Sequence, residues 1–241
     1  MINNYSLPLF PLHSVICPFG HMRLRIFEQR YLDMVKSCLR NKTPFGIVAI
    51  APEKTNKPDG NLPFASVGTI INIIEADVTT IGLIMINCIG QQRIKIHSFE
   101  QQSDGLIIGN LSEISNDLEI PIPDDLKIVS FRLQRLIESF SNHGELTNDI
   151  PIAKPYQYND ASWVSNRWVE LLDLPLLDKQ RLMQLDSPIV RLELIYDLLD
   201  LPSTRSRSKK KNAVDATNAI EINQKEIPTK SFACKTTPDV A

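Results

Sequence analysis

The sequence lacks the motifs of the common catalytic classes. None of its nine glycines is followed by lysine, which excludes the phosphate-binding loop of P-loop nucleotide hydrolases. There is no GxGxxG, GxSxG or HExxH motif. The four cysteines form no CxxC pair, and the four histidines show no HxxxH spacing. We therefore predict no catalytic residues, no cofactor and no metal site.

Long hydrophobic runs are also absent. No stretch approaches the roughly 18 uninterrupted apolar residues of a transmembrane helix. The N-terminal sequence MINN lacks the basic and apolar regions of a signal peptide. These observations predict a cytoplasmic protein that does not enter membranes.

The charge of the chain is unevenly distributed. Residues 203–241 hold eight Lys and Arg and four acidic residues, which is a charge of +4. The other 18 basic and 24 acidic residues of the chain give residues 1–202 a charge of −6. Because nucleic acids need a basic surface, this acidic body argues against them as the main partner. The polar composition of residues 203–241 predicts a disordered tail.

Residues 1–120 have the pattern of short strands. Phe45–Ile50 is a compact apolar run, and Val67–Ala76 and Ile81–Ile89 are rich in β-branched residues. Arg93–His97 alternates with period two. The turn signals are Lys57–Gly60, Gly90–Gln92 and Ser103–Gly105. Several short strands separated by turns predict a barrel or a sandwich.

One helix interrupts these strands. Phe27, Tyr31, Val35 and Cys38 follow helical spacing, and Asn41–Pro44 ends the pattern. We expect Phe27 and Tyr31 to anchor this helix to the sheet.

The segment before that helix is predicted as strand, turn and strand. Leu7–Phe10 is expected at a sheet edge, because Pro8 and Pro11 limit its hydrogen bonding. Gly20 is expected to give the backbone the freedom that a turn requires.

After residue 120 the apolar period changes to that of helices. Asp124 and Asp125 are predicted to cap the first helix, and Asp160 the second. The apolar stripe of the first helix begins at Leu126. The other three helices are expected at Ala161–Leu172, Leu177–Leu185 and Pro188–Leu199.

Five motifs occur in a specific order. They are PLFPL at 8–12, RIFEQRYLDM at 25–34, PFGIV at 44–48, VGTIINI at 67–73 and GQQRIKI at 90–96. In this order they resemble the N-terminal substrate-binding domain of Lon proteases, over about residues 5–200. That domain type also occurs as a short stand-alone bacterial protein and is related to the Lon-like domain of cereblon. Where relatives have a PGG-like turn, this chain has CPFGH at 17–21.

The resemblance implies an α+β fold, with a PUA-like β pseudo-barrel that contains one embedded helix and is followed by a C-terminal helical bundle. The barrel is expected at residues 1–120, the helical subdomain at 121–202 and the disordered basic tail at 203–241. Lon proteases continue with ATPase and Ser/Lys peptidase modules, for which this chain has neither the GK pair nor the room. The implied function is a non-catalytic polypeptide-binding or adaptor module. Its partners would be polypeptide substrates, or a protease or chaperone.

A peptide site is expected in a groove where the barrel meets the bundle. The candidate contacts are six aromatic residues, Phe10, Phe19, Phe64, Tyr156, Trp163 and Trp168. For each of them, packing in the hydrophobic core is the alternative.

Two other functions stay open. A PUA-like surface helped by the basic tail predicts nucleic-acid binding. An enzyme would use Cys17 as a nucleophile, with His13 and His21 four positions to either side. The apolar surroundings of Cys17 are instead typical of a buried, unreactive thiol.

Overall fold

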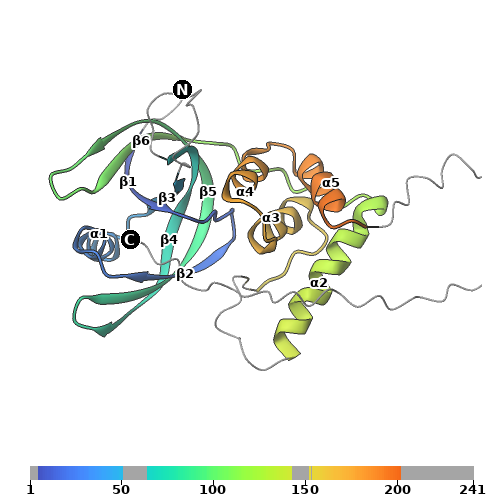
Figure 1. Cartoon of the computed structure of the whole chain (residues 1–241), viewed down its shortest axis with the longest axis horizontal. Helices are drawn as coiled ribbons and strands as arrows, with labels where there is room; N and C mark the ends of the chain where they lie inside the picture. Colours follow the sequence, from blue (N-terminus) through green and yellow to red (C-terminus); the bar gives the residue numbers. More distant parts are fainter. Residues whose placement is uncertain (1–4, 51–63, 143–151, 153, 202–241) are drawn as a thin grey trace, which may run out of the picture.

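The computed structural model describes residues 5–50, 64–142, 152 and 154–201, which form a mixed α and β architecture (Figure 1). The strands are β1 (Tyr5–Leu12), β2 (His21–Ile26), β3 (Phe45–Ile50), β4 (Phe64–Thr80), β5 (Leu83–Gln101) and β6 (Ile107–Glu113). The helices are α1 (Gln29–Asn41), α2 (Lys127–Asn142), α3 (Ala161–Leu171), α4 (Leu176–Gln184) and α5 (Pro188–Leu198), and a short 3-10 turn η1 (Asp124–Leu126) precedes α2.

The six strands form one sheet that closes on itself. Neighbouring strands follow the order β2-β5-β4-β3-β1-β6, and β6 also pairs with β5. β5 allows this closure because it is long, so that residues 84–89 pair with β2 and residues 94–101 with β6. The strand-rich pattern of residues 1–120 therefore folds as a ring of strands, with β2 added outside the ring.

β1 is an interior strand, which corrects the prediction of an edge. It pairs with β3 in parallel on one side and with β6 antiparallel on the other. Pro8 and Pro11 both lie inside these paired stretches. The edge prediction was wrong because the closure of the sheet gives β1 a second neighbour, which proline content alone does not reveal.

The predicted turns have different outcomes. Gly90–Gln92 is not a turn, because β5 continues through it with a register shift against β4. Ser103–Gly105 is a turn, with Gly105 at a φ of 86°. Lys57–Gly60 lies outside the described residues.

α1 packs on the side of the ring that faces away from the other helices (Figure 1). Its buried residues include Tyr31, Val35 and Cys38, which share a core cluster with Phe10 and other residues of the ring. The predicted helical stripe is therefore confirmed for these three positions. Phe27 does not anchor the helix, since it precedes the helix and is 47% exposed.

The helices after residue 120 begin largely where predicted. The Asp160 carboxylate accepts hydrogen bonds from the N–H groups of Ser162 and Trp163 at the start of α3. Ser187 caps α5, whose first turn contains Pro188. Asp124 does not cap a helix as predicted, because η1 starts after Pro123 and the Asp124 carboxylate contacts Lys127 at 2.6 Å.

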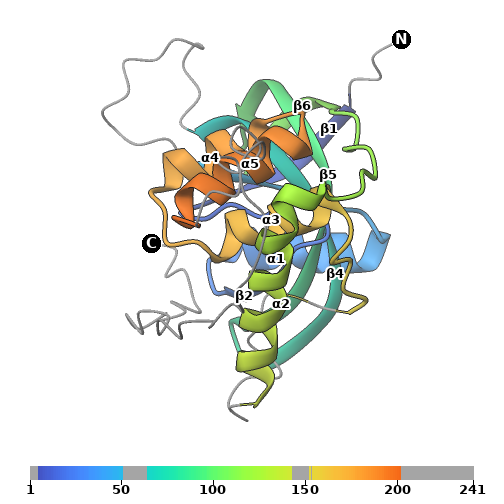
Figure 2. The same ribbon diagram turned by 90° about the vertical axis from the view of Figure 1, so that its right-hand side faces the viewer.

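The ring and the helices share one hydrophobic core. Val15, Cys17 and Ala49 from the β-rich part belong to the same buried cluster as residues of α2, α3, α4 and α5. Figure 2 shows α3 between the sheet and α2. None of the helices in the described ranges is long and apolar enough to cross a membrane. The candidate site described next lies along this shared boundary.

Candidate functional site

The loop between β1 and β2 ends in a tight turn at residues 17–20. The Gly20 N–H donates to the Cys17 carbonyl at 2.9 Å, with Pro18 and Phe19 at the two central positions. Phe19 has a φ of 62°, so the turn has the pattern of type II, in which proline is common second and glycine or asparagine third. The left-handed residue is therefore Phe19 and not Gly20, which corrects the prediction.

Phe19 combines backbone strain with exposure. A left-handed conformation costs a bulky L-residue about 1–2 kcal/mol, and such strain persists where the surroundings impose it. Here the Phe19 N–H donates to the Gly90 carbonyl at 2.8 Å, and the Gly90 N–H donates to the Gly20 carbonyl at 2.8 Å. The Phe19 side chain is nevertheless 52% exposed. The fold thus holds an aromatic ring toward solvent at the tip of a fixed turn.

Two charged residues of α3 hold the turn from the other side. Glu170 Oε1 accepts the N–H of Cys17 at 2.8 Å, and Arg167 Nη2 donates to the Pro18 carbonyl at 2.9 Å. Arg167 Nε and Glu170 Oε2 form a buried ion pair at 2.9 Å. Gly20 lies so close to this pair that a Cβ would be 2.0 Å from Glu170 Oε1. Glycine is required here for space.

We expect Gly20→Ala to lower the free energy of unfolding by about 2 kcal/mol, because overpacked sites typically lose 1–3 kcal/mol. The new methyl group would press on Glu170 and, at 2.9 Å, on the Cys17 carbonyl. Urea denaturation measures the effect. Gly82→Ala is the comparison for backbone strain without crowding, because Gly82 has a positive φ and open space around its Cβ position, and it should lose about 1–2 kcal/mol. Equal midpoints for wild type and Gly20→Ala would contradict the crowding argument.

Cys17 does not have the environment of a nucleophile. It is fully buried, and its burial, together with Glu170, raises the pKa of the thiol to about 12. His13 is exposed, whereas burial and Arg167 lower the pKa of the half-buried His21. Because the thiolate is the reactive form, this thiol is poorly suited to catalysis at neutral pH. In the described part of the chain no three His, Cys, Asp or Glu side chains group as metal ligands.

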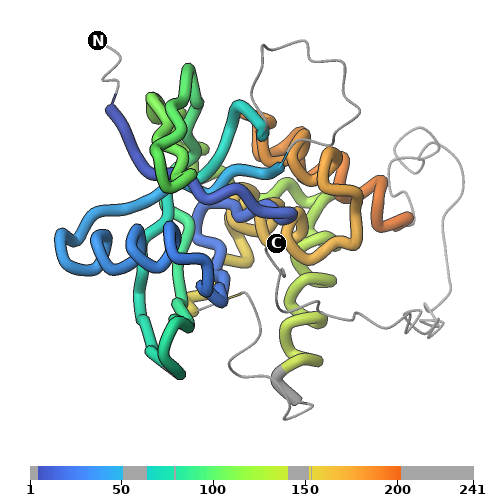
Figure 3. Tube along the Cα trace, turned by 60° about the vertical axis from the view of Figure 1, so that its left-hand side comes forward, coloured from blue at the N-terminus to red at the C-terminus, as the bar shows by residue number. Residues whose placement is uncertain are grey.

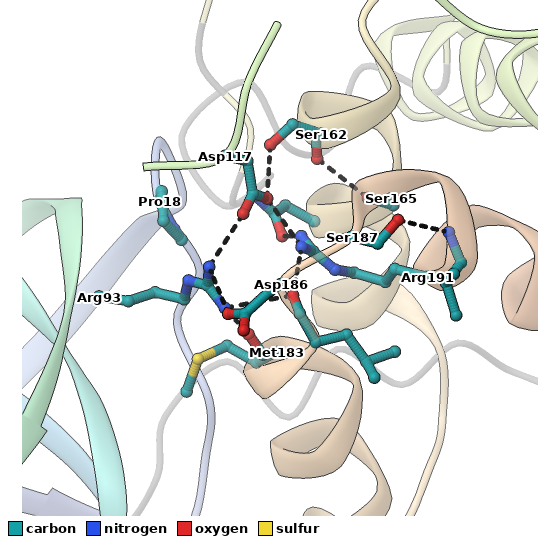
Figure 4. Close-up of polar contacts among 12 residues, drawn as sticks. Pro18, Arg93, Asp117, Ser162, Ser165, Met183, Asp186, Ser187 and Arg191 are labelled. Carbon is teal, nitrogen blue, oxygen red and sulfur yellow. Dashed lines mark hydrogen bonds and ion pairs between the residues drawn. The ribbon is translucent and has the colours of Figure 1, made fainter. Parts of the chain in front are cut away.

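A second buried charge cluster joins the sheet to the helices (Figure 4). Asp117, in the link between β6 and η1, contacts Arg93 Nη2 at 3.0 Å through one oxygen and Arg191 Nη2 at 2.7 Å through the other. Ser162 Oγ also donates to Asp117, at 2.8 Å. One carboxylate from the link thus binds β5, α3 and α5 together.

The two arginines also bind the end of α4. Arg93 Nη1 donates to the carbonyls of Met183 and Leu185, at 3.1 and 3.2 Å. Arg191 Nη2 donates to the Leu185 carbonyl at 2.9 Å, and its Nη1 donates to Asn166. Cations are favourable at the C-terminus of a helix, where carbonyl groups lack helical partners. The cluster thus joins α3, α5 and the end of α4 to β5 of the sheet.

Four of the six predicted aromatic contacts are buried. Phe10 lies in the barrel core, with its ring centroid 4.2 Å from that of Tyr31. Phe64 lies in a different part of the barrel, against Phe99. Trp163 and Trp168 belong to the core shared by the sheet and the helices. These four side chains pack in the hydrophobic core, which was the alternative to a peptide contact. They therefore offer little surface for a peptide.

The other two predicted aromatic contacts, Tyr156 and Phe19, are partly exposed to solvent. Tyr156 is half-buried, and its ring centroid lies 6.2 Å from that of Trp163. Phe19 is exposed at the turn. The structure therefore does not bring the six residues into one groove.

Sequence patterns missed the residues that hold this region together, which are Arg93, Asp117, Arg167, Glu170 and Arg191. One signal was available for Arg191. It stands in the largely apolar helical stretch PIVRLEL, where a solvated charge is unexpected, whereas the mixed stretch SNRWVEL around Arg167 gives no such signal. A charged residue on an apolar face predicts a buried partner, although not its identity.

Comparison with known proteins adds the family. The family model of the ATP-dependent protease La (LON) substrate-binding domain matches residues 6–200 of this sequence. The chain belongs to this family. The Lon N-terminal domain protein from Xanthomonas campestris shares its fold with a TM-score of 0.64 and 30% identity, covering 82% of this chain and 99% of that one. The N-terminal domain of the Mycobacterium avium complex Lon protease, at 15% identity and a TM-score of 0.53, covers 81% of this chain and 98% of that one and shows the fold alone.

Two curated relatives are much longer proteins. Lon protease 1 of Myxococcus xanthus is 23% identical over 230 residues, which are 92% of this chain and 27% of the relative. The Lon protease of Cytophaga hutchinsonii is 24% identical over 199 residues, which are 80% of this chain and 24% of the relative. This Lon substrate-binding domain chain thus spans about a quarter of the length of these relatives. The activity of the whole proteases does not transfer with the similarity.

Proposed function

We propose that this protein is a non-catalytic polypeptide-binding or adaptor module, and that Phe19 is its main exposed contact. The proposal is supported by the family, whose description is that of a substrate-binding domain. The observation that carries it is the strained, exposed Phe19, held by a turn that buried charges fix from behind. Strain at an exposed aromatic residue points to function, since the same turn would be easier to form with glycine.

The chemistry of such a contact is simple. An exposed phenyl ring on a held turn can bury apolar side chains of a partner at a low entropy cost, because the backbone is already held and phenylalanine has only two side-chain torsions. Tyr156, half-buried, is a second candidate contact. The partner would be an unfolded polypeptide, or a cytoplasmic protease or chaperone to which this module presents one.

Replacing Phe19 by alanine should weaken binding of a fluorescently labelled, permanently unfolded polypeptide about tenfold, which is the loss typical of a central aromatic contact. Fluorescence anisotropy measures the affinity. The matched control is Phe131→Ala, on α2, because Phe131 is 55% exposed and Phe19 52%. The control should keep wild-type affinity. Equal losses for both variants would contradict a specific role of Phe19.

Thermal unfolding of the same variants separates binding from folding. Phe19→Ala should unfold at a temperature close to that of the wild type, since the ring is exposed. Phe19→Gly should be as stable or slightly more stable, because it removes the left-handed strain. A large drop in stability for either variant would assign Phe19 to the core instead.

Nucleic-acid binding stays a prediction. The basic residues that would support it, 203–241, lie outside the described residues. RNA binding that falls steeply with salt and disappears when residues 203–241 are deleted would favour it over the polypeptide reading.

A further inference from the structure

β4 and β5 extend beyond the ring as a hairpin arm that projects away from α2–α5 (Figures 1 and 3). The arm comprises β4 from about residue 72 and β5 up to about residue 89, and it turns at Gly82, whose φ is 84°. β2 pairs with the β5 side of the arm, at residues 84–89. β5 is therefore the middle strand of this part of the sheet, and β4 is its outer strand.

The outer edge of the arm is open. β3 pairs with β4 only as far as Ile71, so within the described residues no strand covers the far side of positions 72–80. The two strands of the arm differ in how far their apolar side chains are buried. Ile84 and Ile86 of β5 are buried, whereas Val78 of β4 is 69% exposed. An uncovered edge of this kind presents backbone N–H and C=O groups that can pair with an added strand.

Register shifts delimit the usable part of the edge. They fall between Ile73 and Glu75 and between Val78 and Thr80. Bulges of this type interrupt a ladder and protect edges from unspecific pairing. Between them, residues 75–78 keep a continuous antiparallel register with β5. The edge therefore offers four regular residues, enough for a short extended segment.

The side chains of these four residues alternate in chemistry. Glu75 and Asp77 lie on the outer face, where Asn87 of β5 donates to the Glu75 carboxylate at 2.8 Å. Ala76 and Val78 lie on the other face, in register with Ile86 and Ile84. That face continues into the buried core under α1. An added strand would thus meet acidic groups on one face and apolar groups on the other.

Resting on the proposed polypeptide-binding function, we propose that this edge binds an extended segment in which basic residues alternate with apolar ones. The basic side chains would lie opposite Glu75 and Asp77, and the apolar ones would extend the face of Ala76 and Val78. The charges across the sheet support this order. Arg23 pairs in register with Asn87, which pairs with Glu75, so the rows run from basic through neutral to acidic. A basic residue on an added strand would lie directly opposite the acidic row, and opposite charges across strands are favourable.

A second copy of the chain fits this edge poorly. Antiparallel pairing of two copies centred on Ala76 keeps the apolar faces together, but it places Glu75 of each copy opposite Asp77 of the other. Like charges directly opposite one another destabilise a sheet. Pairing centred between residues 76 and 77 would instead mix acidic and apolar side chains on one face. The charges therefore favour a partner of different sequence.

The test uses three blocked peptides and fluorescence anisotropy. The first has the core Lys-Val-Lys-Ile-Lys-Val, the second has Glu in place of Lys, and the third is the first with a backbone N-methyl group at every residue. The wild type should bind the first about tenfold more tightly than the second, because two cross-strand charge pairs change sign. The third should not bind, because its backbone cannot form the ladder. Equal affinities for all three peptides, or no binding of the first, would overturn the proposal.

A charge reversal on the protein gives the sharper result. Glu75→Lys combined with Asp77→Lys should reverse the preference, so that the Glu peptide binds more tightly than the Lys peptide. The control is Glu119→Lys combined with Glu138→Lys, which makes the same change in net charge at exposed positions away from the arm. It should keep the wild-type preference. Reversal by both double variants would mean that net charge alone attracts the peptides, and would overturn the proposal.

The Phe19 variant and the peptide panel distinguish binding at the β4 edge from polypeptide binding in general. If Phe19→Ala weakens binding of the unfolded polypeptide while the peptide panel shows no preference, the polypeptide-binding function stands and the edge proposal is overturned. If Phe19→Ala binds like the wild type while the charge reversal switches peptide preference, the edge is the binding surface and the role of Phe19 is overturned.

Discussion

Replacing Asp117 by alanine should lower the free energy of unfolding by about 3–5 kcal/mol, the loss typical of breaking a buried ion pair by removing one partner. The side chains of Asp117, Arg93 and Arg191 are all less than a tenth exposed. Without the carboxylate, two guanidinium groups remain in the interior with carbonyl and amide partners, and the exposed Asp186 beside Arg93 is their one remaining carboxylate contact in the described part of the chain. The sheet and the helices would separate more easily, because Asp117 joins β5 to α5.

Asp186 provides the control for this experiment. Its carboxylate lies 3.4 Å from the same Arg93 Nη2, but its side chain is 90% exposed. Asp186→Ala should therefore change stability by less than about 1 kcal/mol, as exposed ion pairs do. Urea denaturation at neutral pH compares the two variants. Similar losses for Asp117→Ala and Asp186→Ala would show that burial does not decide the strength of these contacts.

Local patterns predicted the secondary structure well. The cap at Asp160 and the buried α1 positions Tyr31, Val35 and Cys38 follow from rules that act over a few residues, namely satisfaction of the first N–H groups and helical periodicity. Phe45–Ile50 is β3 with the predicted bounds, because a compact apolar run is also a local signal. The mistaken turn at Gly90–Gln92 shows the limit of such rules. These residues read as a turn, but pairing with β4 keeps them in a strand.

Contacts between distant parts of the chain could not be predicted in this way. Arg93, Asp117 and Arg191 meet although up to 98 positions separate them, and no periodicity or motif connects them. The edge prediction for β1 failed for the same reason, since closure of the ring by β5 and β6 is a long-range event. The residue patterns left a barrel or a sandwich open, and the choice between them came from the family resemblance.

The aromatic candidates show why sites are harder to predict than folds. Phe, Tyr and Trp are the main residues of cores and of binding surfaces alike, so residue type does not distinguish the two. Phe10 and Trp168 alternate with other apolar residues in regular elements and are buried. Phe19 follows a proline and precedes a glycine, which marks a turn and hence a surface position. Turn context was the discriminating signal.

Glu170 should make the free energy of unfolding fall as the pH rises toward 7. Burial raises its pKa from the ordinary value of 4.5 to about 7, although Arg167, the Cys17 N–H and Lys179 favour the charged form. The folded protein therefore binds a proton here more tightly than the unfolded chain does. Its contribution to stability is fully present below pH 4.5 and is lost as the pH rises to about 7. A pKa rise of this size corresponds to about 3 kcal/mol.

Glu170→Gln removes the titration and keeps an oxygen that can accept the Cys17 N–H. Measured by urea denaturation between pH 5 and pH 8, the wild type should lose about 2–3 kcal/mol more than this variant does. The control is Glu138→Gln, because it makes the same replacement at an exposed glutamate on α2 and leaves the Glu170 carboxyl in place, so the loss assigned to Glu170 should remain. Parallel curves for wild type and Glu170→Gln would mean that Glu170 stays ionised in the folded protein throughout this range. Because Glu170 holds the turn that carries Phe19, a confirmed shift would also predict that polypeptide binding changes with pH over the same interval in the wild type and not in Glu170→Gln.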